Sequence, residues 1–457
     1  AEEAAQAKRR GECLMGHLNK DVPGLDQGPR SFYLSLAAAL DRYNQDGYKC
    51  VRSHLDPCVF WICKAKSETL EPSEAFETKG ETLEAKNILG PEKDTTIGAL
   101  CVHVDDIRAR GTDQAIEKIV EHLKNEFDIG SLESFPADKK SGQEEPTSYT
   151  FTGVRYTQED NGTWMEQQQY LSTLQVLAKD AEAEEFASKV GQLQWMTRSR
   201  PEIKGRMSRL AGELMEPTTE GITSVRQVTK HLLQTKHYRR WLPKLKGKVR
   251  VVAHADASFA NDGTRSRGAY VVALHDEYGQ IAIVDTQGRG LRRVTASTFD
   301  AECLALVGAA DAAVAVAQMW GEAMYGPASL VEYQKCKLAG RPGHEQGSQT
   351  LEVHLLNDSE GVIKALESVK PLQNKRRAVD IDMLRELRRQ GIVTTIKHCR
   401  TDVNVADPFT KELGPKAATQ ELLLDQLYGA NRIVGEGGDV SHALLAMVWE
   451  LERQSLQ

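Results

Sequence analysis

The chain has 457 residues, 40% of them hydrophobic, and a formal net charge of −7. This length predicts two or three globular units with buried cores. The acidic balance argues against a protein that coats nucleic acid over its whole surface, because phosphate binding needs clustered Lys and Arg. Eight scattered cysteines form no C-x-x-C pair and no zinc-site spacing, which favours a reducing, intracellular setting. We find no uninterrupted apolar run of about 18 residues and no signal peptide, so we expect no membrane partner.

The first predicted strands are two short apolar runs at 58–63 and 97–104, which we expect to pair antiparallel. Between them, residues 66–93 are rich in Glu, Ser and Lys and predict an excursion from the hairpin. Residues 113–127 follow with apolar side chains at helical spacing and with Asp113 as the expected N-cap.

A second strand pair is predicted at 149–156 and 162–166, and a helix is expected to start at Tyr170. The segment 198–250 then carries fourteen Lys or Arg against four Glu, a net charge of +10, in a mainly helical pattern. These cations predict a local surface for nucleic acid. An ordinary solvated helical face accounts for the segment equally well when it is taken alone.

The remaining pattern alternates strands and helices. It comprises strands at 249–255, 268–275 and 280–286, an Ala-rich helix at 297–319, a strand at 351–357, helices from about 360 and 377, and a strand at 392–398. This order predicts a mixed sheet flanked by helices, in an α/β (α+β) multidomain protein. Residues 321–350 are rich in Gly and polar side chains and predict an insertion.

Four acidic residues stand at the ends of these elements: Asp256 and Asp358 after strands, Glu302 in the first turns of the Ala-rich helix, and Asp407 before a helical turn. Each one alone is more simply an Asx turn, a surface charge or an N-cap. Together at one sheet edge they would raise each other's pKa, a conflict that divalent cations relieve. Oxygen ligands favour Mg²⁺ or Mn²⁺, and two such ions about 4 Å apart promote phosphodiester hydrolysis. The set therefore predicts a two-metal nuclease site.

The acids lie in ordered motifs: Asp256-Ala257-Ser258, Ala296-Ser297-Thr298-Phe299-Asp300-Ala301-Glu302, Asn357-Asp358-Ser359, Lys375-Arg376-Arg377-Ala378-Val379-Asp380-Ile381-Asp382 and Ala406-Asp407-Pro408-Phe409-Thr410-Lys411. With them, the segment from about 251 to 413 resembles the ribonuclease H domain of copia-type retrotransposon polyproteins. The resemblance implies a ribonuclease H-like mixed five-stranded sheet with flanking helices. It also implies cleavage of RNA in RNA–DNA hybrids, with two Mg²⁺ or Mn²⁺ ions held by the four acids. Ser359 and Arg377-Ala378 depart from the family pattern and are expected to alter substrate contacts while sparing the metal ligands.

Two further adjacent acids, Asp105 and Asp106, are expected at the tip of a hairpin after Val102-His103-Val104. Such a pair binds Mg²⁺ beside a nucleoside triphosphate in some enzymes, whereas an isolated Asp-Asp is more often a solvated β-turn. With Leu18-Asn19-Lys20-Asp21 before it and Phe151-Thr152-Gly153-Val154 after it, the chain up to about 174 resembles a copia-type reverse transcriptase. This implies a partial palm in which Asp105 and Asp106 are catalytic metal ligands.

Two departures predict that the polymerase activity is lost. His103 stands where the family usually has Tyr, and no residues precede Ala1 to supply the fingers and the first catalytic aspartate. The chain opens on Ala1 instead of methionine, so we expect it to be a piece of a longer protein. The remaining polyprotein portion, or another polymerase chain, is then a candidate partner.

The resemblances imply four parts: a reverse transcriptase remnant at 1–185, a basic helical connection at 186–248, a ribonuclease H-like domain at 249–415 and a helical tail at 416–457. The expected partners are RNA–DNA hybrids and other nucleic acid. The expected location is intracellular, in the cytoplasm, in virus-like particles or in the nucleus. The main alternative is a catalytically inactive retroelement remnant that only binds nucleic acid. Integrase-like strand transfer fits less well, because those enzymes use three acids ending in a helix-borne Glu and have no counterpart of Asp407.

Overall fold

The computed structural model describes residues 28–64, 95–133, 147–260, 265–327, 351–370, 372, 375–411 and 418–429. The excursion expected at 66–93 lies outside these residues, as do most of the predicted insertion at 321–350 and most of the predicted tail at 416–457. The chain divides into two compact units, the first made of Ala1–Glu74 with Asp94–Leu132 and the second of Ala75–Lys93 with Glu133–Gln457.

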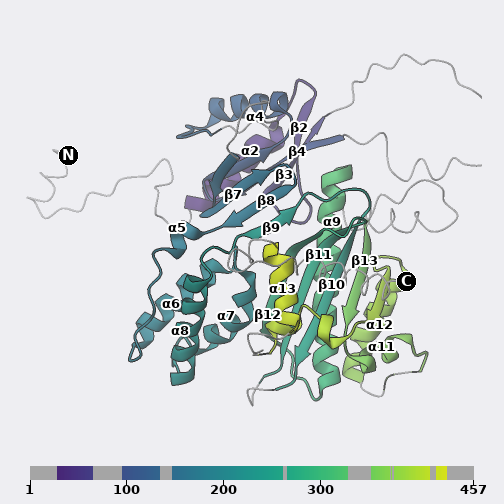
Figure 1. The fold of residues 1–457 in the computed structure, drawn as a ribbon. Coiled ribbons are helices and arrows are strands. Elements are labelled where there is room, and N and C mark those ends of the chain that lie inside the picture. The colour runs from purple at the N-terminus through teal and green to yellow at the C-terminus, as the bar shows by residue number, and fades with distance from the viewer. Residues whose placement is uncertain are drawn as a thin grey trace, which may run out of the picture. The chain divides into compact units, whose positions relative to one another are not determined.

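The first unit contains an antiparallel sheet with helices on one face (Figure 1). Its elements are α2 (Gly28–Arg42), β1 (Asn44–Gln45), β2 (Tyr48–Arg52), β3 (Val59–Lys64), β4 (Thr95–His103), β5 (Asp106–Arg110) and α4 (Asp113–Glu126). The strands lie in the order β1-β2-β3-β4-β5. The expected pairing of the two apolar runs is confirmed, since β3 and β4 are antiparallel with Phe60 opposite Leu100. The expected helix also forms, but its N-cap is Thr112 and not Asp113, which lies in the first turn.

The second unit begins with an antiparallel meander of β6 (Thr147–Phe151), β7 (Val154–Glu159), β8 (Gly162–Glu166) and β9 (Arg240–Pro243). The single strand expected at 149–156 is therefore wrong, because a turn at Thr152 and Gly153 divides it. Both residues have positive φ, 48° and 71°, which reverses the chain. The strand-like pattern of side chains continues on both sides of the turn, so the sequence alone did not indicate the turn.

Between β8 and β9 the chain forms helices: α5 (Gln168–Leu171), α6 (Ala183–Met196), α7 (Lys204–Leu210) and α8 (Thr219–Gln234), with short 3₁₀ turns η1 (Pro201–Ile203) and η2 (Ala211–Glu213). The segment 198–250 is thus helical only up to Gln234, since β9 and the start of β10 complete it. Some of its cations lie inside the protein. Arg200 is 1% exposed, and Lys204 donates to the Thr286 carbonyl across 2.8 Å. The basic surface is correspondingly smaller than the sequence count suggests.

A five-stranded sheet forms the centre of the second unit. Its strands are β10 (Val249–Ser258), β11 (Arg267–Asp276), β12 (Ile281–Gly290), β13 (Glu352–Asn357) and β14 (Thr395–His398), in the order β12-β11-β10-β13-β14. β11 is antiparallel to β10 and β12, whereas β13 is parallel to β10 and β14. The predicted mixed five-stranded sheet, and with it the mixed α/β class, is confirmed.

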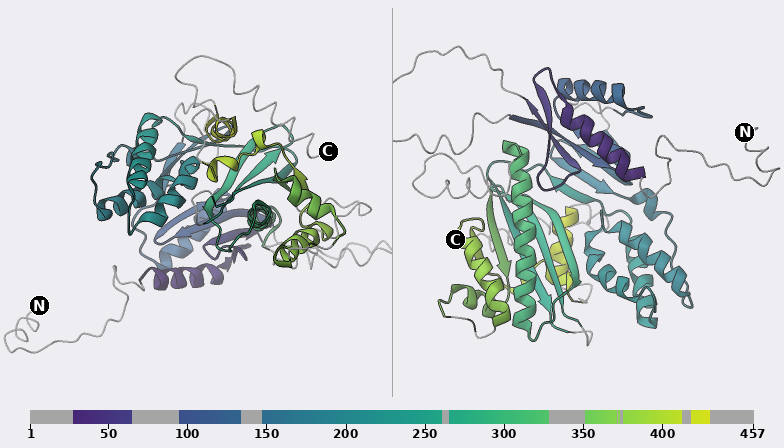
Figure 2. Two further views of the ribbon diagram at one scale, coloured as in Figure 1. Left: turned by 90° about the horizontal axis from the view of Figure 1, so that it is seen from below. Right: turned by 180° about the vertical axis from the view of Figure 1, so that it is seen from behind.

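Helices cover both faces of this sheet. On one face lie α9 (Thr298–Tyr325), α11 (Glu360–Glu367) and α12 (Lys375–Arg389), which share a core with β10 and β13. On the other lie α13 (Ala418–Tyr428) and the turns η3 (Thr401–Val403) and η4 (Asp407–Phe409), whose apolar side chains pack against β11 and β12. Figure 2 shows α9 running along the sheet with α11 and α12 beside it.

Helix α9 approaches the sheet through a row of small residues. Alanines at four-residue spacing, all buried, form one stripe of the helix: Ala301, Ala305, Ala309, Ala313 and Ala317. Within this helix, Thr298–Met324 is long and apolar enough to cross a membrane, with a mean hydropathy of 1.6. Asp300, Glu302 and Asp311 interrupt its sequence, so it contains no uninterrupted apolar run of about 18 residues. Its buried stripe belongs to the core of the second unit.

Candidate metal centre

Three of the predicted acids meet at one end of the five-stranded sheet. β10 and β13 are parallel with Ala255 beside Asn357, so Asp256 and the residue after β13, Asp358, lie next to each other at the same end of the sheet. Asp256 was expected after its strand, but it lies within β10, opposite Ala269 of β11. Glu302 lies in the second turn of α9, which begins after the N-cap Ser297. One carboxylate oxygen from each of Asp256, Glu302 and Asp358 lies within 4.8 Å of the others.

Burial changes the acidity of two of these groups. It raises the pKa of Asp256 to about 7, an effect that the charges of Asp407 and Asp358 reinforce and that Lys411 and Thr410 oppose. Burial also raises the pKa of Glu302 to about 8, with a further contribution from the charge of Asp256. Both shifts express the cost of holding like charges together away from water.

Polar neighbours that the sequence analysis did not assign to the site hold these acids. Asn357 donates through Nδ2 to Glu302 Oε2 across 2.9 Å and to the Ala255 carbonyl across 3.1 Å. The Ala257 amide donates to Glu302 Oε1 across 3.3 Å. Thr410 donates its hydroxyl to Asp256 Oδ2. The sequence signal for these roles was adjacency, since Asn357 directly precedes an acid and Thr410 stands three residues after Asp407.

Asp407 is not part of this group of three. Its Oδ1 forms an ion pair with the ammonium group of Lys411, and its Oδ2 accepts from the Thr419 hydroxyl at 3.4 Å. Lys411 also lies 3.6 Å from Asp256 Oδ1. The fourth predicted ligand is therefore connected to the other acids through a lysine.

Asp105 and Asp106 lie in the first unit, at the turn between β4 and β5 where the sequence predicts them. Both are exposed, and Val104 in the same turn has a φ of 56°. Among the residues that the structure describes, these two acids join no group of three metal-ligand side chains. Their own geometry is that of a solvated hairpin tip.

Arg377 has a structural role that differs from the expected substrate contact. It is 3% exposed, and its Nη1 donates to Asp380 Oδ2 across 2.8 Å. Its Nε lies 3.9 Å from Asp300 Oδ1. Because Asp300 stands two residues before Glu302, Arg377 connects α12 to the turn of α9 that presents the acid.

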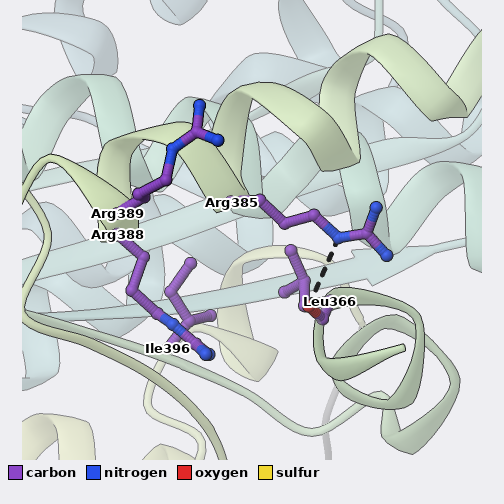
Figure 3. Close-up of a pocket in the computed structure, with 5 residues that line it drawn as sticks. All are labelled: Leu366, Arg385, Arg388, Arg389 and Ile396. Carbon is purple, nitrogen blue, oxygen red and sulfur yellow. Dashed lines mark hydrogen bonds between the residues drawn. The ribbon is translucent and has the colours of Figure 1, made fainter. Parts of the chain in front are cut away.

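A separate pocket of about 190 Å³ lies between α11, α12 and β14. Leu366, Arg385, Arg388, Arg389 and Ile396 line it (Figure 3). Arg385 donates to the carbonyl groups of Ala365, Leu366 and Ser368 and so closes the end of α11. None of the carboxylates described above lines this pocket, and we assign it no role in the site.

The donor set of the three acids fits a divalent metal ion. Asp256 is 1% exposed, and its Oδ1 accepts no hydrogen bond, with the Lys411 ammonium group 3.6 Å away. A buried carboxylate oxygen without a donor costs free energy, and a cation would remove that cost. Three carboxylates with converging oxygens are hard ligands of the kind that Mg²⁺ and Mn²⁺ prefer.

No protein-family model matches the chain, and no curated protein matches it. Solved structures do. The RNase H1 of the halophilic archaeon Halobacterium salinarum NRC-1 is similar with 20% identity over 35% of this chain and 93% of that one, at a TM-score of 0.21. LC11-RNase H1 in complex with an RNA/DNA hybrid is similar with 15% identity over 35% of this chain and 93% of that one, at a TM-score of 0.24. The protease-reverse transcriptase of Prototype Foamy Virus shares 11% identity over 71% of this chain and 43% of that one, at a TM-score of 0.18.

Proposed function

We propose that this chain is a retroelement protein whose second unit cuts the RNA strand of RNA–DNA hybrids in the presence of Mg²⁺ or Mn²⁺. The observation that carries the proposal is the convergence of Asp256, Glu302 and Asp358, whose carboxylate oxygens lie within 4.8 Å of one another. The ordered sequence motifs around these acids support the copia-type ancestry. An intracellular location fits this activity.

The three acids would hold the metal ion. When bound, such an ion lowers the pKa of a water molecule and stabilises negative charge on a phosphodiester. The chain itself supplies the fixed geometry: Thr410 orients Asp256, and Asn357 with the Ala257 amide orients Glu302. Held in this way, the acids need little reorganisation when they bind a cation.

We also propose that the chain does not synthesise DNA. The only acids at the predicted polymerase position, Asp105 and Asp106, are exposed, and no third described ligand residue joins them. Two adjacent carboxylates on a solvated turn position a metal ion and a triphosphate poorly. A primer-extension assay with Mg²⁺ tests this, and incorporation of deoxynucleotides that an Asp106→Asn substitution abolishes would overturn it.

A cleavage assay tests the nuclease assignment. The full chain is incubated with an RNA–DNA hybrid labelled on the RNA strand, with Mg²⁺ and separately with EDTA. We expect Mg²⁺-dependent RNA cuts that Asp358→Asn and Glu302→Gln each reduce by at least 100-fold, since these ligands act together. Glu367→Gln, at an exposed position of α11, is the matched control and should cut normally.

The same assay separates the enzyme from a remnant that only binds nucleic acid. Hybrid binding without cuts, at both Mg²⁺ and Mn²⁺, would favour the remnant. Cleavage that persists unchanged in both ligand variants would show that other residues carry out the reaction.

A further inference from the structure

Lys411 lies between Asp256 and Asp407, two of the four acids that the sequence predicts to hold two metal ions together. It stands four residues after Asp407, and its backbone amide donates to the Asp407 carbonyl across 3.2 Å. Its ammonium group pairs with Asp407 Oδ1 and lies 3.6 Å from Asp256 Oδ1. A cationic group of this chain therefore already stands between these two carboxylates.

The two oxygens of each acid have different neighbours. Asp256 Oδ2 accepts from Thr410, and Asp407 Oδ2 accepts from Thr419. The two Oδ1 atoms both face Lys411, which lies between them. A divalent ion at this position would have to displace the ammonium group.

The Lys411 side chain is 36% exposed, so its position between the two carboxylates does not depend on complete enclosure.

We propose that the Lys411 ammonium group occupies the second cation position, between Asp256 and Asp407, so that the chain binds one divalent ion where the sequence predicts two. This inference rests on the proposed function, because the first ion belongs to Asp256, Glu302 and Asp358. It makes Lys411 a positioning residue that neutralises Asp407 and one oxygen of Asp256. A lysine in this place supplies one positive charge at a site that an ion would give two.

Counting bound Mn²⁺ tests the inference without any cleavage assay. The full chain is titrated with Mn²⁺ alone, and free Mn²⁺ is measured by electron paramagnetic resonance. We expect one tight ion per wild-type chain and two per Lys411→Met chain, because methionine keeps the length of the stem and removes the charge. The double variant Lys411→Met/Asp407→Asn should return to one. Lys364→Met, which removes a surface lysine paired with Glu360, should leave the count at one.

The Mn²⁺ counts distinguish a failure of the proposed function from a failure of this inference. A folded wild-type chain that binds no Mn²⁺ would overturn the proposed function together with the inference. Two ions on the wild-type chain, or one ion on a folded Lys411→Met chain, would overturn the inference and leave the proposed function standing. If Lys411→Met does not fold, Lys411→Gln replaces it, and the wild-type count still distinguishes one ion from two.

Discussion

Asn357 donates through Nδ2 to Glu302 Oε2 across 2.9 Å and so joins the end of β13 to the second turn of α9. The same amide group reaches the Ala255 carbonyl of β10. One side chain that is fully buried thus fixes three elements at the point where the acids meet.

Asn357→Ala should destabilise the protein by about 2 kcal/mol, because it leaves buried partners without donors. It should also weaken Mg²⁺ binding at least 10-fold, since Glu302 loses the group that orients it. Urea denaturation and calorimetric Mg²⁺ titration measure the two effects. Asn404→Ala is the matched control: Asn404 is equally buried and donates to the same Ala255 carbonyl across 3.0 Å, without a hydrogen bond to Glu302. If Asn404→Ala lowers Mg²⁺ affinity as much as Asn357→Ala, orientation of Glu302 is not the cause.

The two raised carboxyl pKa values predict how stability varies with pH without metal. Asp256 and Glu302 shift from ordinary values of 3.8 and 4.5 to about 7 and about 8 in the folded protein. Between these limits the folded state binds protons that the unfolded state has released, so the free energy of unfolding should fall as pH rises from about 4 to about 8. Thermal melts in EDTA measure this. Asp256→Asn should be less sensitive to pH over that range, and a slope that matches wild type would contradict the assignment.

For Glu202 we expect the opposite dependence at lower pH: the free energy of unfolding should rise with pH. Burial raises its pKa, but the charge of Arg200 with the interactions of His231 and Tyr428 outweighs burial and lowers the pKa to about 2. The contribution of Glu202 to the free energy of unfolding is complete above pH 4.5, its ordinary pKa, and is lost as the pH falls toward 2. Glu202→Gln should cost about 3 kcal/mol at pH 7, because it leaves the buried Arg200 unpaired.

The comparison of melts at pH 7 and at the lowest pH where the chain still folds measures this effect. The difference between wild type and Glu202→Gln should shrink as the carboxyl group of the wild type is protonated. Glu220→Gln, on the exposed first turn of α8, serves as the control and should change stability little at either pH. A difference that does not depend on pH would mean that the ion pair is not its source.

Gly205 permits a close approach that positions the turn carrying Asp407. A Cβ atom there would lie 2.5 Å from the Phe409 carbonyl oxygen, a backbone atom that cannot move aside easily. Gly205→Ala should therefore destabilise the chain by about 2 kcal/mol through overpacking. Gly191 in α6 offers the matched substitution, because its Cβ would meet nothing within 4 Å, and Gly191→Ala should stabilise by about 0.5 kcal/mol. Equal effects of the two substitutions in denaturant melts would refute the close-approach argument.

Periodic patterns in the sequence predicted much of the fold. The apolar runs at 249–255 and 351–357 gave β10 and β13 because both strands are buried on both faces. The Ala-rich helix was predicted as well, although it extends to Tyr325. The turn inside 149–156 was missed because it continues the strand pattern on both sides, and β9 was missed because its four residues lie within a basic segment that otherwise forms helices.

The parts of the site that could not be predicted depend on contacts between residues far apart in the sequence. The order of the motifs indicated which acids converge, since parallel strands bring Asp256 and Asp358 to one edge. That Lys411 stands between Asp256 and Asp407 follows from side-chain positions that spacing does not determine. Similarly, the internal role of Arg377 depends on Asp300 and Asp380, which belong to different helices. Charge counts along the chain cannot distinguish such a buried arginine from one that faces a substrate.

The hydrogen bond between Arg200 and Tyr428 bears on how this chain can be divided. Arg200 Nε lies 3.2 Å from the Tyr428 hydroxyl, across 228 residues of sequence, and both side chains are buried. A fragment beginning at 249 would keep Tyr428 without Arg200 and Glu202, and a fragment ending at 415 would keep those two without Tyr428. Either cut would separate Tyr428 from Arg200 and Glu202. The buried polar groups that remain would lose their partners and become exposed to water. A nuclease fragment prepared for study should therefore extend from β6 through α13.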